Sequence, residues 1–488
     1  MNLINNFNFK FFKYTLGLTL LFIGIVMIPC FVLAIIEDEK AKLPFLISLL
    51  IIGIISLPLI FFNRNYPRVL TKKDGKLFVG FLWIIIPIFG ATPYMFSQNV
   101  FPFIIDALFE SFSGFTTTGS TIINDIDSLD KSLLLWRGIT QWIGGLGIIL
   151  FVILLIRNFH NGSNYLFNAE FTSIDKEKIQ PHIKDTVYRI LYIYIFITLL
   201  SILLLSFGDM NVFSSILYSF STVSTGGFTA NNAGLSSFSA YSQYVITLIM
   251  ILSGLSYALL YWAYKGKWRK LFEDEQTKYY FLIILFASVG LFVALHFSKQ
   301  YSIMESVRIA IFNITSIVTT TGYFLPQIKD ISQIIIFIMI VLMFIGGCSG
   351  SSSTGLKIVR VIILFKYFNN SFKRIFHPRA VIPIRYNKNV LVDDAIGIVF
   401  GFFFLYLIIF VVGAFLLTLF GSNFFDAISI SAANISNTGS FIPYLEPEEQ
   451  YASMSFGAKT TIILLMIVGR LEIYSLLAIF SKTIWRRS

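Results

Sequence analysis

Charge and cysteine are both scarce in this sequence. Only 13% of its 488 residues are Asp, Glu, Lys or Arg, whereas 56% are hydrophobic. A water-soluble chain of this length could not hide so much apolar surface, so a soluble globular protein is excluded. The two cysteines, Cys30 and Cys348, lie in apolar stretches without a C-x-x-C pair, and the four histidines are scattered. A structural disulfide, a thiol redox centre and a histidine metal site are therefore not expected.

Long apolar runs recur along the whole chain. A bilayer core of about 30 Å is crossed by a helix of about 20 apolar residues, so each run predicts a transmembrane helix. The predicted spans are 14–36, 43–63, 76–96, 133–156, 187–207, 242–263, 278–297, 331–365, 396–420 and 458–481. The first follows Lys10 and Lys13 but is too long for the apolar core of a signal peptide. The sequence predicts an all-α polytopic membrane protein.

Four shorter apolar pieces lie between consecutive spans. They cover 102–115, 212–223, 303–318 and 424–435, lengths typical of re-entrant segments. Similar sequences follow them: TTTGS (116–120), STGGF (224–228), TTTGY (319–323) and SNTGS (436–440). This recurrence predicts four helix–pore-loop–helix repeats in a pseudo-fourfold arrangement. The predicted division is an N-terminal helix pair at 1–73, followed by repeats at 74–165, 166–272, 273–380 and 381–488.

Basic residues gather on one side of the membrane if the predicted spans alternate in direction. They occur at 72–76, 157–184, 265–270, 366–388 and 482–487, whereas the opposite segments are acidic or neutral. Lysine and arginine favour the cytoplasmic side, so we expect both termini to be cytoplasmic and every short piece to enter from outside. This sorting accounts for the net charge of +11, which does not indicate nucleic acid as a partner.

The four Thr-Gly segments have the composition of a cation-coordinating turn. Irregular backbone at membrane depth is tolerated where it is buried in protein or lines water. Four such segments around one axis would direct carbonyl and hydroxyl oxygens at a dehydrated cation, and the negative C-terminal ends of the preceding helices would favour it. Glycine permits the positive φ values that such a strand can need. The alternative, a mere helix kink or loop turn, is disfavoured by four equivalent copies.

The eighth predicted span is interrupted by GGCSGSSST at 346–354. Each glycine in a helix interior costs about 1 kcal/mol relative to alanine, so the run predicts a loop that blocks the pore and can move. The predicted gating residues here are Gly346, Gly347, Ser349, Gly350, Gly355 and Lys357. The alternative is tight helix packing through small residues. The stretch GSSSTGLK (350–357) is not a phosphate-binding P-loop, because the lysine does not directly follow the second glycine and no strand precedes it.

Arg470 is a charge deep in the last predicted span, about 20 Å from its start at 1.5 Å per residue. Insertion of a charge at that depth costs about 2.5–3.5 kcal/mol, so Arg470 should face water or a partner. We expect it beside the glycine-rich segment, where it either opposes a passing cation or only bonds the carbonyl groups of the loop. Asp106 and Glu110, on the first short piece, either attract cations or hydrogen-bond that helix to its neighbours. Arg137 is expected to be structural.

The chain resembles the TrkH/KtrB superfamily of potassium transporters, specifically the TrkH-like branch with an additional N-terminal helix pair. The resemblance covers essentially the full length and is carried by DALFESFSGFTTTGST (106–121), WRGITQWIGGLGI (136–148), STVSTGGF (221–228), TTTGY (319–323), GGCSGSSSTGLKIVR (346–360) and GRLEIYS (469–475). It implies K⁺ as the transported ion and one filter glycine per repeat, at Gly119, Gly226, Gly322 and Gly439. The remaining implied filter residues are Thr117, Thr118, Thr225, Thr320, Thr321, Asn437 and Thr438.

The resemblance also implies a cellular setting and a function. The setting is the bacterial inner membrane, in contact with lipid, with a homodimer bound to a cytoplasmic ring of nucleotide-binding, TrkA-like regulatory subunits. The function is potassium uptake through a channel-like pore with a glycine-rich intramembrane gate, or alternatively potassium symport coupled to sodium or protons on the same fold. A membrane enzyme would need a nucleophile, base or metal constellation, and a voltage-gated channel an arginine-rich helix; the sequence has neither.

Overall fold

Helices dominate the computed structural model, which describes residues 8–64, 72–97, 100–147, 183–297, 301–325, 333–380, 382–439 and 451–471. The first group is α1 (Phe9–Ile36), α2 (Lys42–Asn63), α3 (Lys72–Gly90), α4 (Thr92–Met95), α5 (Ile104–Phe115) and α6 (Lys131–Leu146). The second is α9 (Ile183–Ser206), α10 (Val212–Val223), the 3₁₀ turn η2 (Gly234–Ser237), α11 (Ala240–Ser253), α12 (Tyr257–Tyr264) and α13 (Trp268–Glu273). The third is α14 (Glu275–Phe297), α15 (Ile303–Val318), α16 (Gln333–Ile345), α17 (Ile358–Phe376), α18 (Asp393–Leu419), α19 (Phe424–Ile435) and α21 (Phe456–Arg470).

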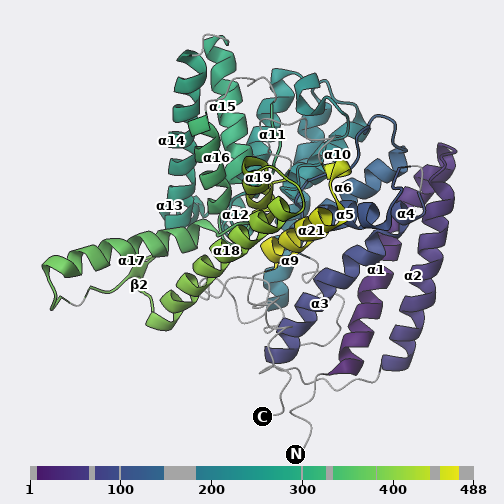
Figure 1. The fold of residues 1–488 in the computed structure, drawn as a ribbon, viewed down its shortest axis with the longest axis horizontal. Coiled ribbons are helices and arrows are strands. Elements are labelled where there is room, and N and C mark those ends of the chain that lie inside the picture. Colours follow the sequence, from purple (N-terminus) through teal and green to yellow (C-terminus); the bar gives the residue numbers. More distant parts are fainter. Residues whose placement is uncertain are drawn as a thin grey trace, which may run out of the picture.

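A small hairpin is the one departure from the predicted all-α class among the described residues. Strands β1 (Arg385–Tyr386) and β2 (Asn389–Val390) pair antiparallel between α17 and α18. Asn387 and Lys388 turn the chain with φ values of +47° and +70°, the left-handed pair that suits a two-residue hairpin. The hairpin lies alongside α17, where Lys366 Nζ donates to the Arg385 oxygen at 2.8 Å, and α17 extends away from the bundle of α14, α15 and α16 (Figure 1).

Six of the described helices are long and apolar enough to cross a membrane. Helices α1 and α2 pack side by side at one edge of the molecule (Figure 1). They expose large apolar side chains such as Ile54 and Phe62, as expected for a surface that faces lipid. Two of the predicted spans, 133–156 and 458–481, are described only as far as residues 147 and 471. The predicted total of ten spans therefore stays a prediction.

The predicted short apolar pieces are confirmed as helices. Helices α10, α15 and α19 begin and end at the predicted residues, and α5 begins two residues after the predicted start at 102. Local sequence explains where two of them begin. The Asn211 side chain accepts a hydrogen bond from the Ser214 backbone at the start of α10, and Ser302 with Glu305 forms a reciprocal capping box at the start of α15.

The short helices are connected by a closed set of contacts. The helix that follows each short helix also packs against the next short helix along the chain. Thus α6 packs against α10, α11 against α15 and α16 against α19, and α21 returns to α5. These four contacts close a cycle, which places the segments after the short helices near one centre.

The predicted span 242–263 is not one continuous helix. Helices α11 and α12 replace it, and they are bent by 104° at the break between them. The glycine-rich segment enters this break: the Cys348 backbone N–H donates to the Gly254 oxygen at 2.9 Å, and the Tyr257 N–H donates to the Gly350 oxygen at 3.1 Å. Backbone groups released by the break are thus satisfied inside the protein, the condition for non-helical backbone at membrane depth.

A buried ion pair fastens the last unit of the cycle to the first. Lys459 Nζ of α21 lies 2.8 Å from Asp106 Oδ1 of α5, and both side chains are almost wholly buried. Removing one partner of a buried pair leaves an uncompensated charge and typically costs about 3–5 kcal/mol. We predict that Lys459→Met lowers the free energy of unfolding by about this amount, measured by denaturant unfolding of the purified protein in detergent.

Two variants serve as controls for this prediction. Lys42→Ala removes an ion pair with Asp38 that is exposed to solvent, and should change stability little. Asp106→Asn added to Lys459→Met removes the orphaned carboxylate and should recover part of the loss. Wild-type stability of the Lys459→Met protein would contradict the assigned role of the pair.

Candidate functional site

The four segments that follow the short helices share one backbone conformation. In each, a residue with positive φ is followed two residues later by a glycine with positive φ. The first set is Thr117, Thr225, Thr320 and Asn437, with φ between +52° and +58°. The second set is Gly119, Gly227, Gly322 and Gly439, with φ between +77° and +83°. We call these segments, residues 116–119, 224–227, 319–322 and 436–439, the four Thr-Gly loops.

In the second Thr-Gly loop, the glycine with positive φ lies one residue later than the sequence indicated. Its glycine equivalent to Gly119 is Gly227, whereas the sequence prediction placed Gly226 at that point. Gly226 instead occupies the position of Thr118 in the first loop. Adjacent glycines in STGGF look alike in sequence, and only the backbone conformation distinguishes their positions.

Each of these glycines faces the backbone of the next loop. A Cβ atom on Gly119 would overlap the carbonyl oxygen of Gly226, one on Gly227 that of Thr321, one on Gly322 that of Thr438, and one on Gly439 that of Thr118. The four contacts form a closed cycle through all four Thr-Gly loops. Every loop therefore needs glycine at this position for two reasons: a positive φ and the close approach of a neighbouring backbone.

Hydroxyl pairs stiffen three of the loops from within. The oxygens of Thr116 and Thr118, of Thr319 and Thr321, and of Ser436 and Thr438 each lie 2.8 Å apart, and all six side chains are buried. The second loop has Ser224 and Gly226 at these positions and lacks such a pair. Its Ser224 hydroxyl donates instead to the Ser221 oxygen of α10 at 3.0 Å.

A buried network around Glu110 of α5 supports the first two loops. Arg137 Nε of α6 lies 2.7 Å from Glu110 Oε1, and the Thr121 hydroxyl and the Ile122 N–H also donate to this carboxylate. The Arg137 guanidinium lies over the Phe228 ring, 4.2 Å from its centre. Asp106 is likewise paired with a lysine, so the contacts of both carboxylates favour the structural interpretation over attraction of cations.

The surface above these loops carries a further connection between the first two. Asn232 Nδ2 donates to Asp125 Oδ1 at 2.9 Å, and the Ile126 N–H donates to Asn232 Oδ1 at 2.7 Å. The hydrogen bond from Asn232, with a further one from Ser128, holds the pKa of the exposed Asp125 carboxyl below its usual range. This carboxylate is therefore charged at neutral pH.

The predicted interruption of the eighth span is confirmed: α16 ends at Ile345 and α17 begins at Ile358. We call residues 346–357 the intramembrane loop. Gly346, Gly350 and Gly355 have positive φ. Tight helix packing through small residues, the alternative interpretation, does not describe this segment because it is not helical.

The intramembrane loop bonds directly to the third and fourth Thr-Gly loops and to the end of α10. The Thr354 N–H donates to the Thr320 hydroxyl at 3.0 Å, and the Thr354 hydroxyl donates to the Ser436 oxygen. The Ser352 hydroxyl donates to the oxygen of Val223, the last residue of α10, at 2.9 Å. The loop therefore lies against the ends of α10, α15 and α19.

Arg470 ends α21 and holds this loop from the other side. Its Nη1 donates to the Ser352 oxygen at 2.8 Å, and its Nη2 donates to the oxygens of Gly144 and Gly145. The arginine thus links the intramembrane loop to the end of α6. Bonding to carbonyl groups of this loop is one of the two roles that the sequence suggested for Arg470. Glu472, two residues further on, lies outside the described residues.

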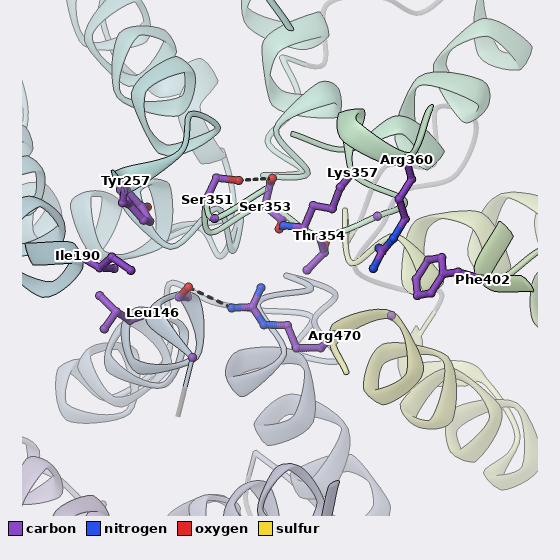
Figure 2. Close-up of a pocket in the computed structure, with 15 residues that line it drawn as sticks. Leu146, Ile190, Tyr257, Ser351, Ser353, Thr354, Lys357, Arg360, Phe402 and Arg470 are labelled. Carbon is purple, nitrogen blue, oxygen red and sulfur yellow. Dashed lines mark hydrogen bonds between the residues drawn. The ribbon is translucent and has the colours of Figure 1, made fainter. Parts of the chain in front are cut away.

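Three cationic side chains line one cavity beneath the intramembrane loop: Lys357, Arg360 and Arg470 (Figure 2). Arg360 was missed by the sequence analysis. Its guanidinium lies 3.8 Å from the centre of the Phe402 ring, and its Nη1 donates to the Leu356 oxygen at 3.2 Å. The signal was the basic pair Lys357 and Arg360 directly after the glycine-rich run, at the junction with α17.

Comparisons with known proteins find matches over nearly the whole chain. A family model described as "TrkH: Cation transport protein" matches residues 45–487. The chain belongs to the TrkH family. The "Trk system potassium uptake protein TrkH" of Salmonella typhimurium is 32% identical over 476 residues, covering 96% of this chain and 97% of that protein. The protein of the same name from Halomonas elongata is 30% identical and covers 97% and 98%.

A solved structure of the TrkH family is also similar. It is described as "Crystal Structure of the Potassium Transporter TrkH from Vibrio parahaemolyticus" and matches with a TM-score of 0.87 and 28% identity, over 98% of this chain and all of that one. The resemblance to the TrkH-like branch is thereby confirmed. Within the described residues, no three histidine, cysteine or acidic side chains are grouped to hold a resident metal ion.

One stretch of this TrkH-family chain contacts several parts of the site. WRGITQWIGGLGI (136–148) supplies Arg137 to Glu110, Gln141 to Gly226, and the carbonyl groups of Gly144 and Gly145 to Arg470. Gly144 also packs against the Phe115 backbone at the end of α5, where a Cβ atom would overlap it. This single helix therefore positions two Thr-Gly loops and the arginine.

Proposed function

We propose that this protein takes up potassium across the bacterial inner membrane through a channel-like pore. The relatives named as Trk system potassium uptake proteins support potassium as the cargo. The observation that carries the proposal is the closed cycle of contacts among the four Thr-Gly loops. A ring of four equivalent loops is the arrangement that surrounds a single ion with oxygens from all sides.

In this proposal the four Thr-Gly loops form a selectivity filter. Carbonyl oxygens of a filter replace the hydration shell of the ion that passes. The proposed filter residues are Thr117, Thr118, Gly119, Thr225, Gly226, Thr320, Thr321, Gly322, Asn437, Thr438 and Gly439, with Gly227 added from the backbone conformation. The C-terminal ends of α5, α10, α15 and α19 precede the loops, and their partial negative charge favours a cation there.

The proposed architecture is a pseudo-fourfold assembly of four pore-loop repeats, with the N-terminal pair α1–α2 outside it. The repeat boundaries proposed from the sequence are 74–165, 166–272, 273–380 and 381–488, after the helix pair at 1–73. The cyclic packing of α5, α10, α15 and α19 supports this division. Both chain ends are proposed to be cytoplasmic; residues 1–7 and 472–488 lie outside the described residues.

The intramembrane loop is proposed as the gate. Thr354 bonds to the third and fourth Thr-Gly loops, so the segment lies directly under the proposed filter. The proposed gating residues are Gly346, Gly347, Ser349, Gly350, Gly355, Lys357 and Arg470. Arg470 bonds the loop in this closed position, and its charge, with those of Lys357 and Arg360, opposes a cation that leaves the filter.

Channel-like conduction is favoured here over coupling to protons. A proton-coupled symporter needs a carboxyl group that exchanges protons within the membrane. The two buried carboxylates next to the first Thr-Gly loop, Asp106 and Glu110, are each paired with a cation. A homodimer and a cytoplasmic ring of TrkA-like nucleotide-binding subunits are proposed as the assembly, on the resemblance and on the Trk system named for the relatives.

The filter proposal predicts the effect of Gly322→Ser. The new side chain would overlap the Thr438 oxygen and would have to adopt a φ of +82°. We expect sodium permeability relative to potassium to rise about tenfold, equivalent to ~1.4 kcal/mol of lost discrimination. Reversal potentials of the protein in a planar bilayer under opposed sodium and potassium gradients measure this ratio, and growth of potassium-uptake-deficient cells on limiting potassium tests uptake.

Gly421→Ser is the matched control. Gly421 also has a positive φ, +101°, but no atom lies within 4 Å of a Cβ atom at this position. Gly421→Ser should keep wild-type selectivity, because it introduces the same backbone strain as Gly322→Ser but no collision with a neighbouring loop. Unchanged selectivity in Gly322→Ser, with the protein folded, contradicts a single filter formed by the four loops.

The gate proposal predicts that Arg470→Ala increases potassium flux. Loss of the charge and of its bonds to Ser352 should release the intramembrane loop, and a barrier lower by ~1.4 kcal/mol gives about tenfold faster flux. Flux into liposomes, measured at equal protein content, is the readout. Arg470→Lys keeps the positive charge but loses the forked guanidinium that bonds two segments at once. This variant therefore separates the contribution of the charge from that of the hydrogen bonds. Loss of folded protein without any gain in flux would support a purely structural arginine.

A further inference from the structure

The second Thr-Gly loop differs from the other three at one position. Thr118, Thr321 and Thr438 each place a hydroxyl group in a pair behind their loop, whereas the second loop has Gly226 there. The carbonyl oxygens of all four residues belong to the cycle described above. The second loop thus has the ring oxygen without the side chain that stiffens it.

Gln141 of α6 occupies the space of the missing threonine. Its Nε2 donates to the Gly226 oxygen at 2.7 Å. Its Oε1 accepts from the Ser221 hydroxyl at 2.7 Å and from the Phe228 N–H at 3.3 Å. The side chain is fully buried, and its amide thereby connects both ends of the second loop to α6.

Gly226 is a glycine because of Gln141 and not because of its backbone. Its φ lies outside the left-handed region, unlike that of Gly227. A Cβ atom at position 226 would collide with Gln141, whose Nε2 and Oε1 would both lie 2.7 Å away, and the three nearest atoms all belong to that side chain. The two residues therefore form a complementary pair that replaces one threonine.

We propose that Gln141 is a specificity-determining positioning residue, which fixes the Gly226 carbonyl group in the ring of the proposed filter. This inference rests on the proposed function and extends it to a residue outside the four loops. A carbonyl group that can rotate adapts to a smaller cation, whereas one held by a buried donor keeps the ring at a fixed size. The amide also withdraws electron density from this oxygen. Among the described residues, no side chain donates to the carbonyl oxygens of Thr118, Thr321 or Thr438, so the ring has one distinct ligand.

Three variants separate this role from general packing. Gln141→Glu keeps the shape and the acceptor atoms but loses the donor to Gly226. Gln141→Ala removes both. Gly226→Thr introduces a side chain where Gln141 lies, and should be disruptive by itself. In the double variant Gln141→Ala, Gly226→Thr, the threonine has room and can pair with Ser224 as its equivalents pair in the other loops.

The readout is the permeability of sodium relative to potassium, from reversal potentials in a planar bilayer, which does not depend on how much protein is present. We expect Gln141→Glu and Gln141→Ala to raise this ratio about two- to tenfold, the range that one net hydrogen bond can account for. The double variant should return toward the wild-type ratio. Gln243→Glu is the matched control: Gln243 of α11 is also buried and donates to backbone oxygens, those of Leu235 and Phe238, away from the four loops.

Two results would overturn the inference while leaving the proposed filter intact. One is wild-type selectivity in Gln141→Glu when Gly322→Ser is strongly impaired. The other is a double variant no better than Gly226→Thr alone. If wild-type protein and Gly322→Ser show the same permeability of sodium relative to potassium, the filter proposal itself fails. This outcome is distinct from the two results that would overturn only the role of Gln141.

Discussion

Close contact between the four Thr-Gly loops is the constraint on which the rest of the structure depends. Each loop places a glycine against the carbonyl oxygen of the next, so no loop can shift without moving its neighbour. The short helices α5, α10, α15 and α19 deliver the loops to this centre, and the helices that follow them close the cycle. In the proposed pore these backbone contacts supply rigidity, and the glycines that allow them are what selectivity would depend on.

Buried charges are distributed so that each has a partner around this centre. Glu110 with Arg137 and Asp106 with Lys459 attach neighbouring units to one another, where an unpaired charge would be costly. Beneath the loops the balance changes, because Lys357, Arg360 and Arg470 line one cavity and bond backbone oxygens of the loop segments or lie over an aromatic ring. In the proposed mechanism this basic cavity is the electrostatic barrier, and displacement of the intramembrane loop together with Arg470 opens it.

The sequence predicted the parts of this structure that depend on segment length and composition. An apolar piece too short to cross a bilayer, followed by Thr-Gly, located α10, α15 and α19 to the residue, and the glycine run predicted the break after α16. Features that depend on contacts between distant segments were not predictable. Gly227 could not be distinguished from Gly226, because both are glycines and only φ separates them. Gln141 looked like an ordinary polar residue of a helix, and the bend between α11 and α12 depends on hydrogen bonds from a loop about a hundred residues away.

In the proposed pore one ion binds within the ring of four loops, and the location of that ion in a crystal is the decisive measurement. Crystals of the protein grown in rubidium or thallium salts, with anomalous scattering recorded, reveal where a potassium-like ion resides. A filter formed by the four loops predicts an anomalous peak on the axis enclosed by the carbonyl oxygens of Thr118, Gly226, Thr321 and Thr438. Ordered loops without an ion between them, and a peak at another place in the molecule, would contradict it.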